Sequence, residues 1–281
     1  MAGALYVVAT PIGNLGDMSP RAVEVLRGVS VIAAEDTRHS APLLRHFAIA
    51  TPMVALHEHN ERQQAEKLVA RLHAGEAVAL ISDAGTPLLS DPGYHLVRAA
   101  QQGGARVIPV PGASALIAAL SASGLPTDRF SYEGFLPAKA AARRERLMSL
   151  QSDPRTLIFY EAPHRIVAAL DDMAQVFGAE REAVLARELT KLYETIRAAA
   201  LGELAAWVGA DADQQKGELV VLVRGAESRP SDALSEESHR VLSLLLAALP
   251  LKQAVALAAE ISGERRNRLY ELAVSLREAE G

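Results

Sequence analysis

Three short blocks of charged residues each follow an apolar run, and their side chains could transfer a proton or hold an anion. The blocks are Glu35-Asp36-Thr37-Arg38, Glu161-Ala162-Pro163-His164-Arg165 and Arg187-Glu188-Leu189-Thr190-Lys191. Carboxylate, imidazole and amine groups are the usual proton acceptors and donors of enzymes, and guanidinium groups bind phosphate. Charged residues at the ends of strands also form solvated ion pairs, and that alternative stays open for each block.

Three loops that follow predicted strands are rich in glycine and proline. They span residues 9–17 with Gly13, residues 82–93 with Gly85, and residues 111–114. Glycine has no Cβ, so such loops can bring backbone N–H groups close to a ligand. Open α/β sheets bind ligands beyond the carboxyl ends of their strands, so the loops predict a ligand site there. An ordinary strand-to-helix turn is the alternative for the first loop.

The sequence lacks several common cofactor and metal signatures. It has no G-x-G-x-x-G after the first predicted strand, no G-x-x-x-x-G-K-[ST] and no H-E-x-x-H. A hydride-transfer enzyme and a P-loop nucleotidase are therefore disfavoured. A surface loop is favoured over a metal site for His57-Glu58-His59, and we expect no metal site.

The elements that must position these residues alternate between apolar runs and helical patterns, which is typical of an α/β fold. The predicted strands of the first half are Leu5–Ala9, Val29–Ala34, Ala77–Ile81 and Arg106–Val110. Helices are predicted to begin at Ser19-Pro20, at a capping box of Asn60 and Gln63, and at Asp91-Pro92.

The pattern restarts after Gly124. The predicted strands of the second half are Phe130–Phe135, Thr156–Tyr160, Ala183–Glu188 and Glu218–Val223. The predicted helices are Ala140–Leu150, Ile166–Phe177 and Glu203–Val208. The aromatic residues Tyr6, Phe135 and Phe159 lie in apolar strands and are predicted to be core residues.

The chain is predicted to have three parts: α/β domains at 1–123 and 124–227, and a linker with a helical extension at 228–281. The linker is Ser228–Leu234, and the extension has helices at Glu237–Leu249, Leu251–Ile261 and Glu264–Ala279. The last two helices resemble a helix-turn-helix. Its nucleic-acid contacts would fall on Arg265, Arg266 and Arg268. Dimer packing and a solvated hairpin are the alternatives.

Composition sets broad limits on the class of protein. The chain has 281 residues, of which 49% are hydrophobic and 22% charged, and it has no cysteine. These values exclude a disordered chain, a disulfide framework and a cysteine nucleophile. No apolar run approaches the ~20 residues of a membrane span, and Met1–Ala9 does not resemble a secretory signal, so we expect a cytoplasmic protein.

The charge balance is uneven along the chain. The formal net charge of −5 argues mildly against a nucleic-acid binder. Five basic residues against two acidic ones between 138 and 155, together with the arginines of the tail, nevertheless predict locally basic surfaces.

Long blocks over nearly the whole chain resemble the tetrapyrrole methylase superfamily, and specifically its RNA-methylating branch. They include LYVVATPIGNLGDMSPRAVEVLRGVSVIAAEDTRHSAPLLRHF, ALISDAGTPLLSDPGYHLVRAA, SASGLPTDRFSYEGFLPAK, RTLIFYEAPHR, ARELTKLYET, KGELVVLV and LPLKQAVALAAEISGERRNRLYELA. The resemblance implies two α/β domains with S-adenosylmethionine in the trough between them, and a C-terminal helical extension. It also implies a homodimer that uses no metal to bind this cofactor.

The resemblance also implies a set of cofactor contacts. They are Pro11, Gly13, Asp83, Ala84, Gly85, Thr86, Ser114, Tyr160, Glu161, Leu189 and Gly217. Ala113 stands where the family often has a second proline, which makes that turn less stiff but leaves its backbone donors available.

In the RNA branch, the resemblance implies that the methyl acceptor is the 2′-hydroxyl of a cytidine in the decoding region of 16S ribosomal RNA. We expect the substrate to be the assembled 30S subunit. A neutral hydroxyl is a weak nucleophile, so the enzyme must align it and steer its proton. The candidates for this role are Glu35, Asp36, Glu188 and Lys191. Arg38 and Arg165 would hold RNA phosphates, and Asn14 would orient the ribose or serve as a turn residue.

Two alternative functions stay open. One is methylation of a small tetrapyrrole in cobalamin or siroheme synthesis, against which the basic tail and the EDTRH and RELTK blocks argue. The other is a non-catalytic RNA-binding protein that senses S-adenosylmethionine, which turnover of labelled cofactor would distinguish.

Overall fold

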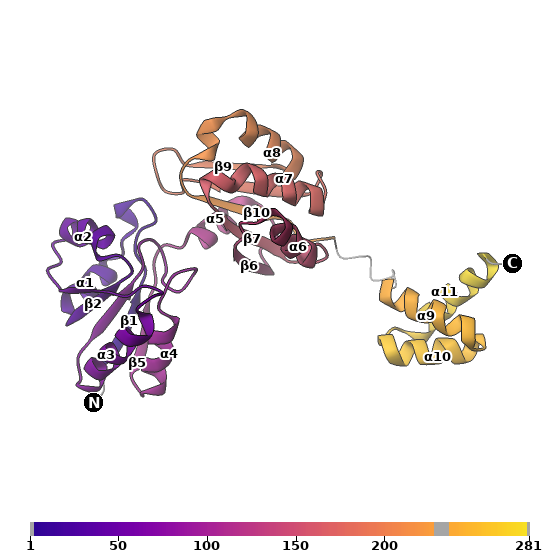
Figure 1. Ribbon diagram of the computed structural model, residues 1–281, viewed down its shortest axis with the longest axis horizontal. Helices are drawn as coiled ribbons and strands as arrows, with labels where there is room; N and C mark the ends of the chain where they lie inside the picture. The colour runs from indigo at the N-terminus through magenta and orange to yellow at the C-terminus, as the bar shows by residue number, and fades with distance from the viewer. Residues whose placement is uncertain (1–2, 228–235, 280–281) are drawn as a thin grey trace. The chain divides into compact units, whose positions relative to one another are not determined.

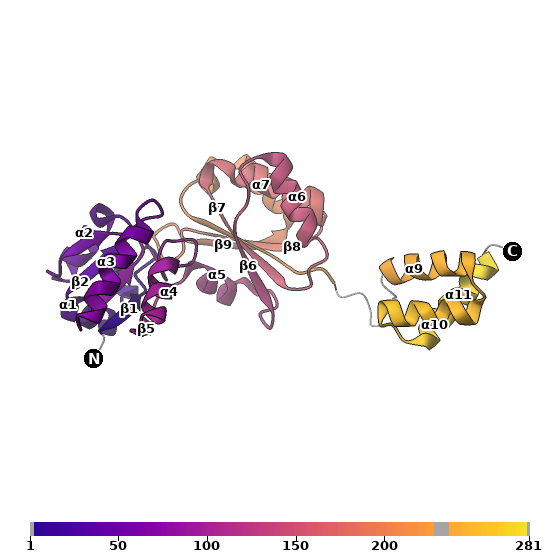
Figure 2. The same ribbon diagram turned by 60° about the horizontal axis from the view of Figure 1, so that its bottom comes forward.

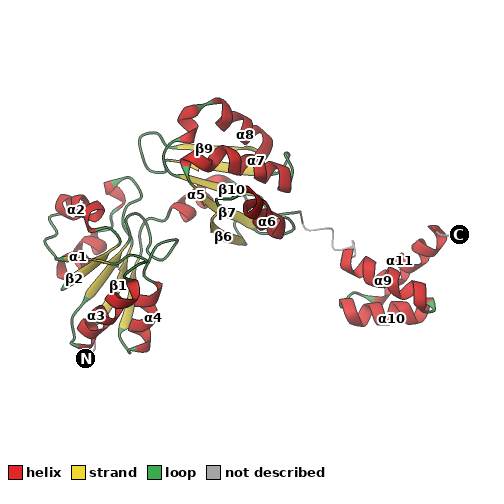
Figure 3. Ribbon diagram, viewed as in Figure 1, coloured by secondary structure: helices red, strands yellow, loops and turns green. Residues whose placement is uncertain are grey.

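The computed structural model describes residues 3–227 and 236–279, in two compact units that divide the chain at Ala226 and Glu227. Figure 1 labels the elements, and Figure 3 colours them by type. The first unit holds two five-stranded sheets, and the second is helical. These parts confirm the predicted fold class. The division of the first unit at residues 123 and 124 stays a prediction, and the predicted linker Ser228–Leu234 lies outside the described residues.

The first sheet is entirely parallel, with strand order β3-β2-β4-β1-β5. Its strands are β1 (Ala4–Val8), β2 (Val31–Ala34), β3 (Met53–Ala55), β4 (Val78–Ile81) and β5 (Arg106–Val110). The central strands β2 and β4 are buried along their whole length, because helices cover both faces of a parallel sheet.

Two pairs of helices cover the first sheet. The helices are α1 (Pro20–Gly28), α2 (Thr37–His46), α3 (Glu61–His73) and α4 (Tyr94–Gln102). Leu26 of α1 and Leu44 of α2 pack in one core cluster, whereas Leu68 of α3 and Leu96 of α4 pack in another. Figure 2 shows α3 and α4 side by side over their face.

The start of α1 is as predicted, since Ser19 Oγ accepts a hydrogen bond from Ala22 N and Pro20 begins the helix. The predicted capping box at Asn60 is wrong. The Asn60 side chain accepts from His57 N and donates to Ala55 O instead, which ties the preceding turn together. The helix predicted at Asp91-Pro92 begins at Tyr94, after Gly93 with φ +130°.

The second sheet is mixed, with strand order β6-β7-β10-β8-β9 and only the β6–β7 pair parallel. Its strands are β6 (Phe130–Phe135), β7 (Thr156–Glu161), β8 (Glu182–Arg187), β9 (Thr195–Ala200) and β10 (Leu219–Val223). The helices are α5 (Ala115–Ser123), α6 (Ala140–Leu150), α7 (Ile166–Phe177) and α8 (Leu201–Ala210). Short 3-10 helices complete the first unit at η1 (Leu15–Asp17), η2 (Pro163–Arg165) and η3 (Ala212–Gln215).

The helices of the second sheet divide unequally between its faces. Leu219, Val221 and Val223 of β10 share a core cluster with residues of α6, α7 and α8. Val220 and Leu222 face the other way and pack with Leu116 and Leu120 of α5. The alternation along β10 therefore buries both faces of this strand.

The second unit is a small helical bundle of α9 (Glu236–Ala248), α10 (Leu251–Ser262) and α11 (Arg266–Ala279). Its core contains Leu242, Val255, Ala258 and Leu269. Gly263 ends α10 in the left-handed conformation with φ +71°. The third helix therefore begins two residues later than the predicted start at Glu264.

Candidate functional site

Three loops meet beyond the carboxyl ends of the first sheet, as their composition predicted. Thr10 N donates to Gly85 O at 2.9 Å, and Gly85 N donates back to Thr10 O at 3.1 Å. Thr86 Oγ1 donates to Ala113 O at 2.9 Å, so the second loop is also tied to the third. These bonds lie between residues far apart in the sequence and hold the three loops in one arrangement.

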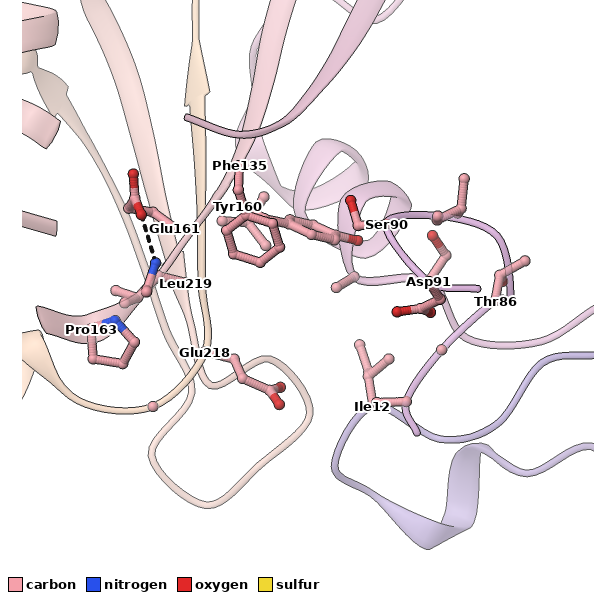
Figure 4. A pocket seen from close by; sticks show the side chains of 18 residues that line it. Ile12, Thr86, Ser90, Asp91, Phe135, Tyr160, Glu161, Pro163, Glu218 and Leu219 are labelled. Atoms are coloured by element: carbon pink, nitrogen blue, oxygen red, sulfur yellow. Dashed lines mark hydrogen bonds between the residues drawn. The ribbon is translucent and has the colours of Figure 1, made fainter. Parts of the chain in front are cut away.

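A first cavity of about 360 Å³ lies against these loops and the second sheet (Figure 4). It is lined by Ile12, Ala84, Gly85, Thr86, Leu89, Ser90, Asp91, Ser114, Ala115, Phe135, Tyr160, Glu161, Ala162, Pro163, Gly217, Glu218, Leu219 and Val220. A mostly apolar cleft of this size with a few polar groups is typical of small-molecule sites.

Two aromatic residues form one side of the first cavity. Phe135 is 53% exposed, so its prediction as a core residue is wrong: it is the last residue of β6 and its ring borders the cavity. The Tyr160 ring lies edge-on to Phe135, and its hydroxyl accepts a hydrogen bond from Leu116 N at 3.1 Å. Burial is the main cause that raises the pKa of Tyr160 to about 12, so this hydroxyl stays neutral.

Glu161 and Arg165 form a buried ion pair in the cavity wall. Glu161 accepts from its neighbour Ala162 N at 2.8 Å and from Arg165 Nη2 at 3.4 Å, and Arg165 Nε lies 3.1 Å from Glu161 Oε1. Burial raises the pKa of Glu161 despite these partners. The Arg165 guanidinium also donates to Leu136 O. Its contacts therefore lie within the wall, although the sequence suggested a role in holding RNA phosphate.

Several acidic side chains follow the carboxyl ends of β2 and β4 in the first sheet. Burial, with the Asp83 carboxylate, raises the pKa of Asp91 to about 6. Burial also raises the pKa of Glu35, with Asp91 and Asp83 adding repulsion. Asp36 differs, because hydrogen bonds from Arg38 lower its pKa to about 2. The Asp36 carboxylate also accepts from Arg38 N and so caps α2.

A second cavity, of about 270 Å³, adjoins the first. It is lined by Pro11, Ile12, Gly13, Leu15, His39, Ser40, Leu43, Asp83, Ala84, Lys191 and Glu218. Of these residues, Ile12, Ala84 and Glu218 line both cavities.

Lys191 extends from the loop after β8 toward the loop after β1. Its Nζ donates to Glu188 Oε1 at 2.7 Å and to Glu218 Oε2 at 3.1 Å. Burial lowers the pKa of Lys191, but the two carboxylates outweigh it and the pKa is raised, so the side chain is an ammonium ion at neutral pH. Glu188 and Thr190 hold positive φ angles of 51° and 66°, a strained conformation that is concentrated at functional sites.

The first cavity fits a ligand that brings its own polar groups. Ser114 Oγ is buried at the start of α5 without a hydrogen-bond partner in the described part of the chain. Gly85 has φ +80°, and a Cβ on it would lie 3.2 Å from Ile12 Cγ2. A donor or acceptor on a bound ligand would satisfy Ser114, and the glycine keeps that wall open.

The structure brings most of the expected cofactor residues together. The first cavity contains Ala84, Gly85, Thr86, Ser114, Tyr160, Glu161 and Gly217, and the second contains Pro11, Gly13, Asp83 and again Ala84. Leu189 lines neither cavity and packs in the core between α5 and the second sheet. No cluster of three or more metal-binding side chains is present among residues 3–227 and 236–279.

The other candidates are spread more widely. Of the residues proposed to assist the hydroxyl, Lys191 lines the second cavity, whereas Glu35, Asp36 and Glu188 line neither. Arg38 is 90% exposed and pairs with Asp36 at 2.8 Å. The exposed Asn14 accepts a hydrogen bond from Gly16 N and caps η1, which is the turn role that was left open for it.

Sequence reasoning missed Phe135, Asp91 and Glu218 as cavity residues. Asp91 lies in the long loop 82–93, for which a ligand site was predicted. Glu218 directly follows Gly217 and immediately precedes β10. Phe135 gave no signal, because an aromatic residue in a strand is usually buried.

The basic stretch between residues 138 and 155 is largely paired with carboxylates. Arg143 and Arg144 donate to the two oxygens of Asp172 at 2.6 and 3.1 Å. Arg146 pairs with Glu133 and Arg155 with Asp153, each at 2.5 Å. These ion pairs neutralise much of the positive charge of the stretch. It therefore offers less unpaired charge for binding an anion than the count of its residues suggested.

The described residues contain no helix that is both long and apolar enough to cross a lipid bilayer. The exposed side chains of Arg265 and Arg266 lie at the start of α11, in the unit that is separate from both sheets.

Comparison with known families gives two matches. Residues 4–205 match the family described as Tetrapyrrole (Corrin/Porphyrin) Methylases. Residues 232–277 match the RsmI C-terminal HTH domain.

Two curated proteins called ribosomal RNA small subunit methyltransferase I are similar over nearly their whole length. The one from Pseudomonas aeruginosa is 64% identical over 97% of this chain and 97% of its own length. The one from Escherichia coli O157:H7 is 56% identical over 97% of this chain and 95% of its own.

Solved structures share the fold at low sequence identity. The methyltransferase CobJ superposes with a TM-score of 0.60 at 19% identity, covering 82% of this chain and 97% of its own. Uroporphyrin-III C-methyl transferase from Thermus thermophilus, complexed with S-adenyl homocysteine, gives a TM-score of 0.53 at 20% identity, covering 80% and 97%.

Proposed function

This chain belongs to the tetrapyrrole methylase family and, within it, to the ribosomal RNA small subunit methyltransferase I group, and we propose that it methylates a ribose 2′-hydroxyl of 16S ribosomal RNA. The acceptor would be a cytidine in the decoding region, the methyl donor S-adenosylmethionine, and the substrate the assembled 30S subunit. The enzyme would act in the cytoplasm as a homodimer.

The observation that carries this proposal is the pair of adjoining cavities with a common wall. The first is largely apolar and has the unpartnered Ser114 Oγ, which suits a nucleoside with polar edges. The second contains the Lys191 ammonium, which can donate to a phosphate or hydroxyl oxygen of RNA. A donor in the first cavity and an acceptor in the second would meet at Ile12, Ala84 and Glu218.

S-adenosylmethionine supplies a methyl group on a sulfonium, which needs little further activation. Phe135 and Tyr160 would cover its base, Gly85 would leave room for it, and Ser114 Oγ would bond to it. The half-buried Asp91 carboxylate would favour its positive charge over the neutral product.

The four residues first considered for the hydroxyl have contacts that favour positioning over proton acceptance. Lys191 is held as an ammonium ion by Glu188 and Glu218, and it would donate to an acceptor oxygen. Glu188 carries a lowered pKa, because hydrogen bonds from Lys191 and Glu218 N outweigh the effect of burial. Asp36 binds Arg38, and Glu35 lines neither cavity.

The test is methyl transfer from labelled S-adenosylmethionine to 30S subunits that lack the modification. We expect label in 16S RNA, and primer extension at low nucleotide concentration should stop at one cytidine of the decoding region. Naked 16S RNA and a small tetrapyrrole serve as matched acceptors, and both should accept much less label. Label in the tetrapyrrole, label in a base, or no turnover would each contradict the proposal.

A further inference from the structure

Glu218 lines both cavities and carries a carboxylate. Of the three residues that line both, Ile12 and Ala84 are apolar, so Glu218 alone among them can exchange a proton. Figure 4 shows its carboxylate reaching into the space beside Ile12. The side chain is 67% exposed, so a substrate can reach it.

Hydrogen bonds with Glu188 fix the backbone of Glu218. Glu218 N donates to Glu188 Oε1, and Glu188 N donates to Glu218 O, both at 2.9 Å. Gly217 makes this approach possible, since a Cβ on it would lie 2.3 Å from the Glu188 carboxylate. The side chain of Glu218 therefore projects from an anchored position just before the start of β10.

Lys191 contacts one oxygen of this carboxylate. The contact is from Nζ to Oε2 at 3.1 Å. An ammonium donor of this kind orients a carboxylate. Because Lys191 also binds Glu188 at 2.7 Å, its charge is shared between the two carboxylates.

We propose that Glu218 is the catalytic residue that accepts the proton of the acceptor hydroxyl. This inference rests on the proposed function. The acceptor oxygen forms a bond to the methyl carbon as the carbon–sulfur bond breaks, and the electron pair of that bond stays on sulfur. The hydroxyl proton passes to the Glu218 carboxylate and then to water. The positive charge that the sulfonium carried is thereby released as this proton. Lys191 is the positioning residue of this pair.

The titratable groups around Glu218 set the background for a pH profile. They are Lys191, Glu188, Asp83, His39, Asp91, Glu161 and Tyr160. Burial raises the pKa of Asp91 to about 6, within the range of the assay, so the profile must be compared between variants rather than read from the wild type alone.

The experiment measures the single-turnover rate of ribose methylation on 30S subunits as a function of pH. Glu218→Gln keeps an oxygen for Lys191 but cannot accept a proton. We expect its rate to fall by about 10²–10⁴-fold. The dependence of rate on pH below neutrality should weaken, with cofactor affinity changed by less than about threefold. Glu218→Asp should recover part of the rate.

Glu182→Gln is the matched control, because Glu182 lies in the same sheet and forms a surface ion pair with Arg224 at 2.7 Å. Its rate should stay at the wild-type value. A Glu218→Gln variant with at least a third of the wild-type rate would overturn the inference, and so would a slow variant that keeps the wild-type pH profile. A wild-type enzyme that leaves no ribose mark would overturn the proposed function itself, which separates the two failures.

Discussion

Lys191 lies directly over Gly13. A Cβ built on Gly13 would stand 2.4 Å from Lys191 Cγ and 2.8 Å from its Cε, and Gly13 has φ +152°. The loops after β1 and β8 therefore approach closely because one of them has no side chain at the point of contact. This approach brings the ammonium group to Glu218 and to the second cavity.

Gly13→Ala should displace Lys191, because the methyl group would overlap a flexible side chain that can move away. We expect a fall of about 10–100-fold in methylation rate, because a displaced Lys191 no longer positions the Glu218 carboxylate. The free energy of unfolding should fall by about 1–3 kcal/mol from backbone strain. Single-turnover kinetics and urea unfolding measure the two effects.

Gly209→Ala is the control for this variant, since Gly209 lies in α8 with no atom within 4 Å of its built Cβ. It should be neutral or stabilising by up to about 1 kcal/mol. In a double-mutant cycle, Gly13→Ala and Lys191→Met should be far from additive. Additive losses in rate would show that the two residues act separately.

Phe135→Ala should weaken cofactor binding without unfolding the protein. The ring is half exposed at the first cavity, so little core packing is lost, but the apolar cover of a bound nucleoside is removed. We expect Kd for S-adenosylmethionine to rise about tenfold, which corresponds to roughly 1.4 kcal/mol. Isothermal titration calorimetry gives this value.

Phe130 provides the comparison, because it begins the same strand, is 40% exposed and does not line either cavity. Phe130→Ala should leave the cofactor Kd within about twofold of the wild type. An equal loss in both variants would mean that β6 as a whole, rather than the Phe135 ring, supports binding.

The sequence predicted the strands with the clearest apolar runs but missed elements with weaker patterns. Neither the short edge strand β3 nor the helix α2, which contains Pro42, was predicted, although the strands β2 and β4 on either side of them were. β9 was missed because its alternation is inverted: the apolar Ile196 is exposed, whereas Arg197 is half-buried. Periodicity reports burial, so edge elements give little signal.

Candidate site residues could be found where the chain order places them next to a strand end. Gly85 and Tyr160 are examples, and both line the first cavity. Which charged groups are already paired could not be found this way. Asp172 is a helical residue far from Arg143 in sequence, yet its carboxylate neutralises that guanidinium. Contacts of this kind depend on the tertiary fold.

Asp172→Asn should test how strongly this pairing stabilises the second sheet and its helices. The side chains of Arg143 and Asp172 are 6% and 10% exposed, so the variant would leave a buried guanidinium without its charge partner. We expect the free energy of unfolding to fall by about 3–5 kcal/mol. Asp213→Asn breaks the exposed pair with Lys216 and should leave the free energy of unfolding nearly unchanged. Equal effects of the two variants would contradict this distinction.

Asp91→Asn should change how stability depends on pH. The native carboxyl has a pKa raised from 3.8 to about 6, mainly by burial, so between these values the native state binds more protons than the unfolded chain. The stability contributed by the neutral form is fully present below about pH 4 and is lost as the pH rises through about 6.

An asparagine stays neutral throughout, so Asp91→Asn should gain stability relative to the wild type above about pH 6. Solvent screens a half-buried group, and we expect a gain of about 1 kcal/mol. Urea unfolding at about pH 4 and about pH 8 measures the difference between the two proteins. A difference that is the same at both pH values would rule out this carboxyl as its source.

The tail arginines should contribute to binding of the ribosomal subunit through phosphate contacts. Arg265 and Arg266 are exposed at the start of α11, so their replacement by alanine should leave the helical bundle intact. We expect weaker binding to 30S subunits and a salt dependence whose logarithmic slope is smaller by about two, one for each lost phosphate contact. The cofactor Kd should not change.

Arg240 belongs to the same bundle but is paired with Glu237 at 2.7 Å, so Arg240→Ala should leave the slope as it is. A slope that is unchanged in the double variant, or one that falls as much in Arg240→Ala, would show that the tail contributes packing rather than phosphate contacts.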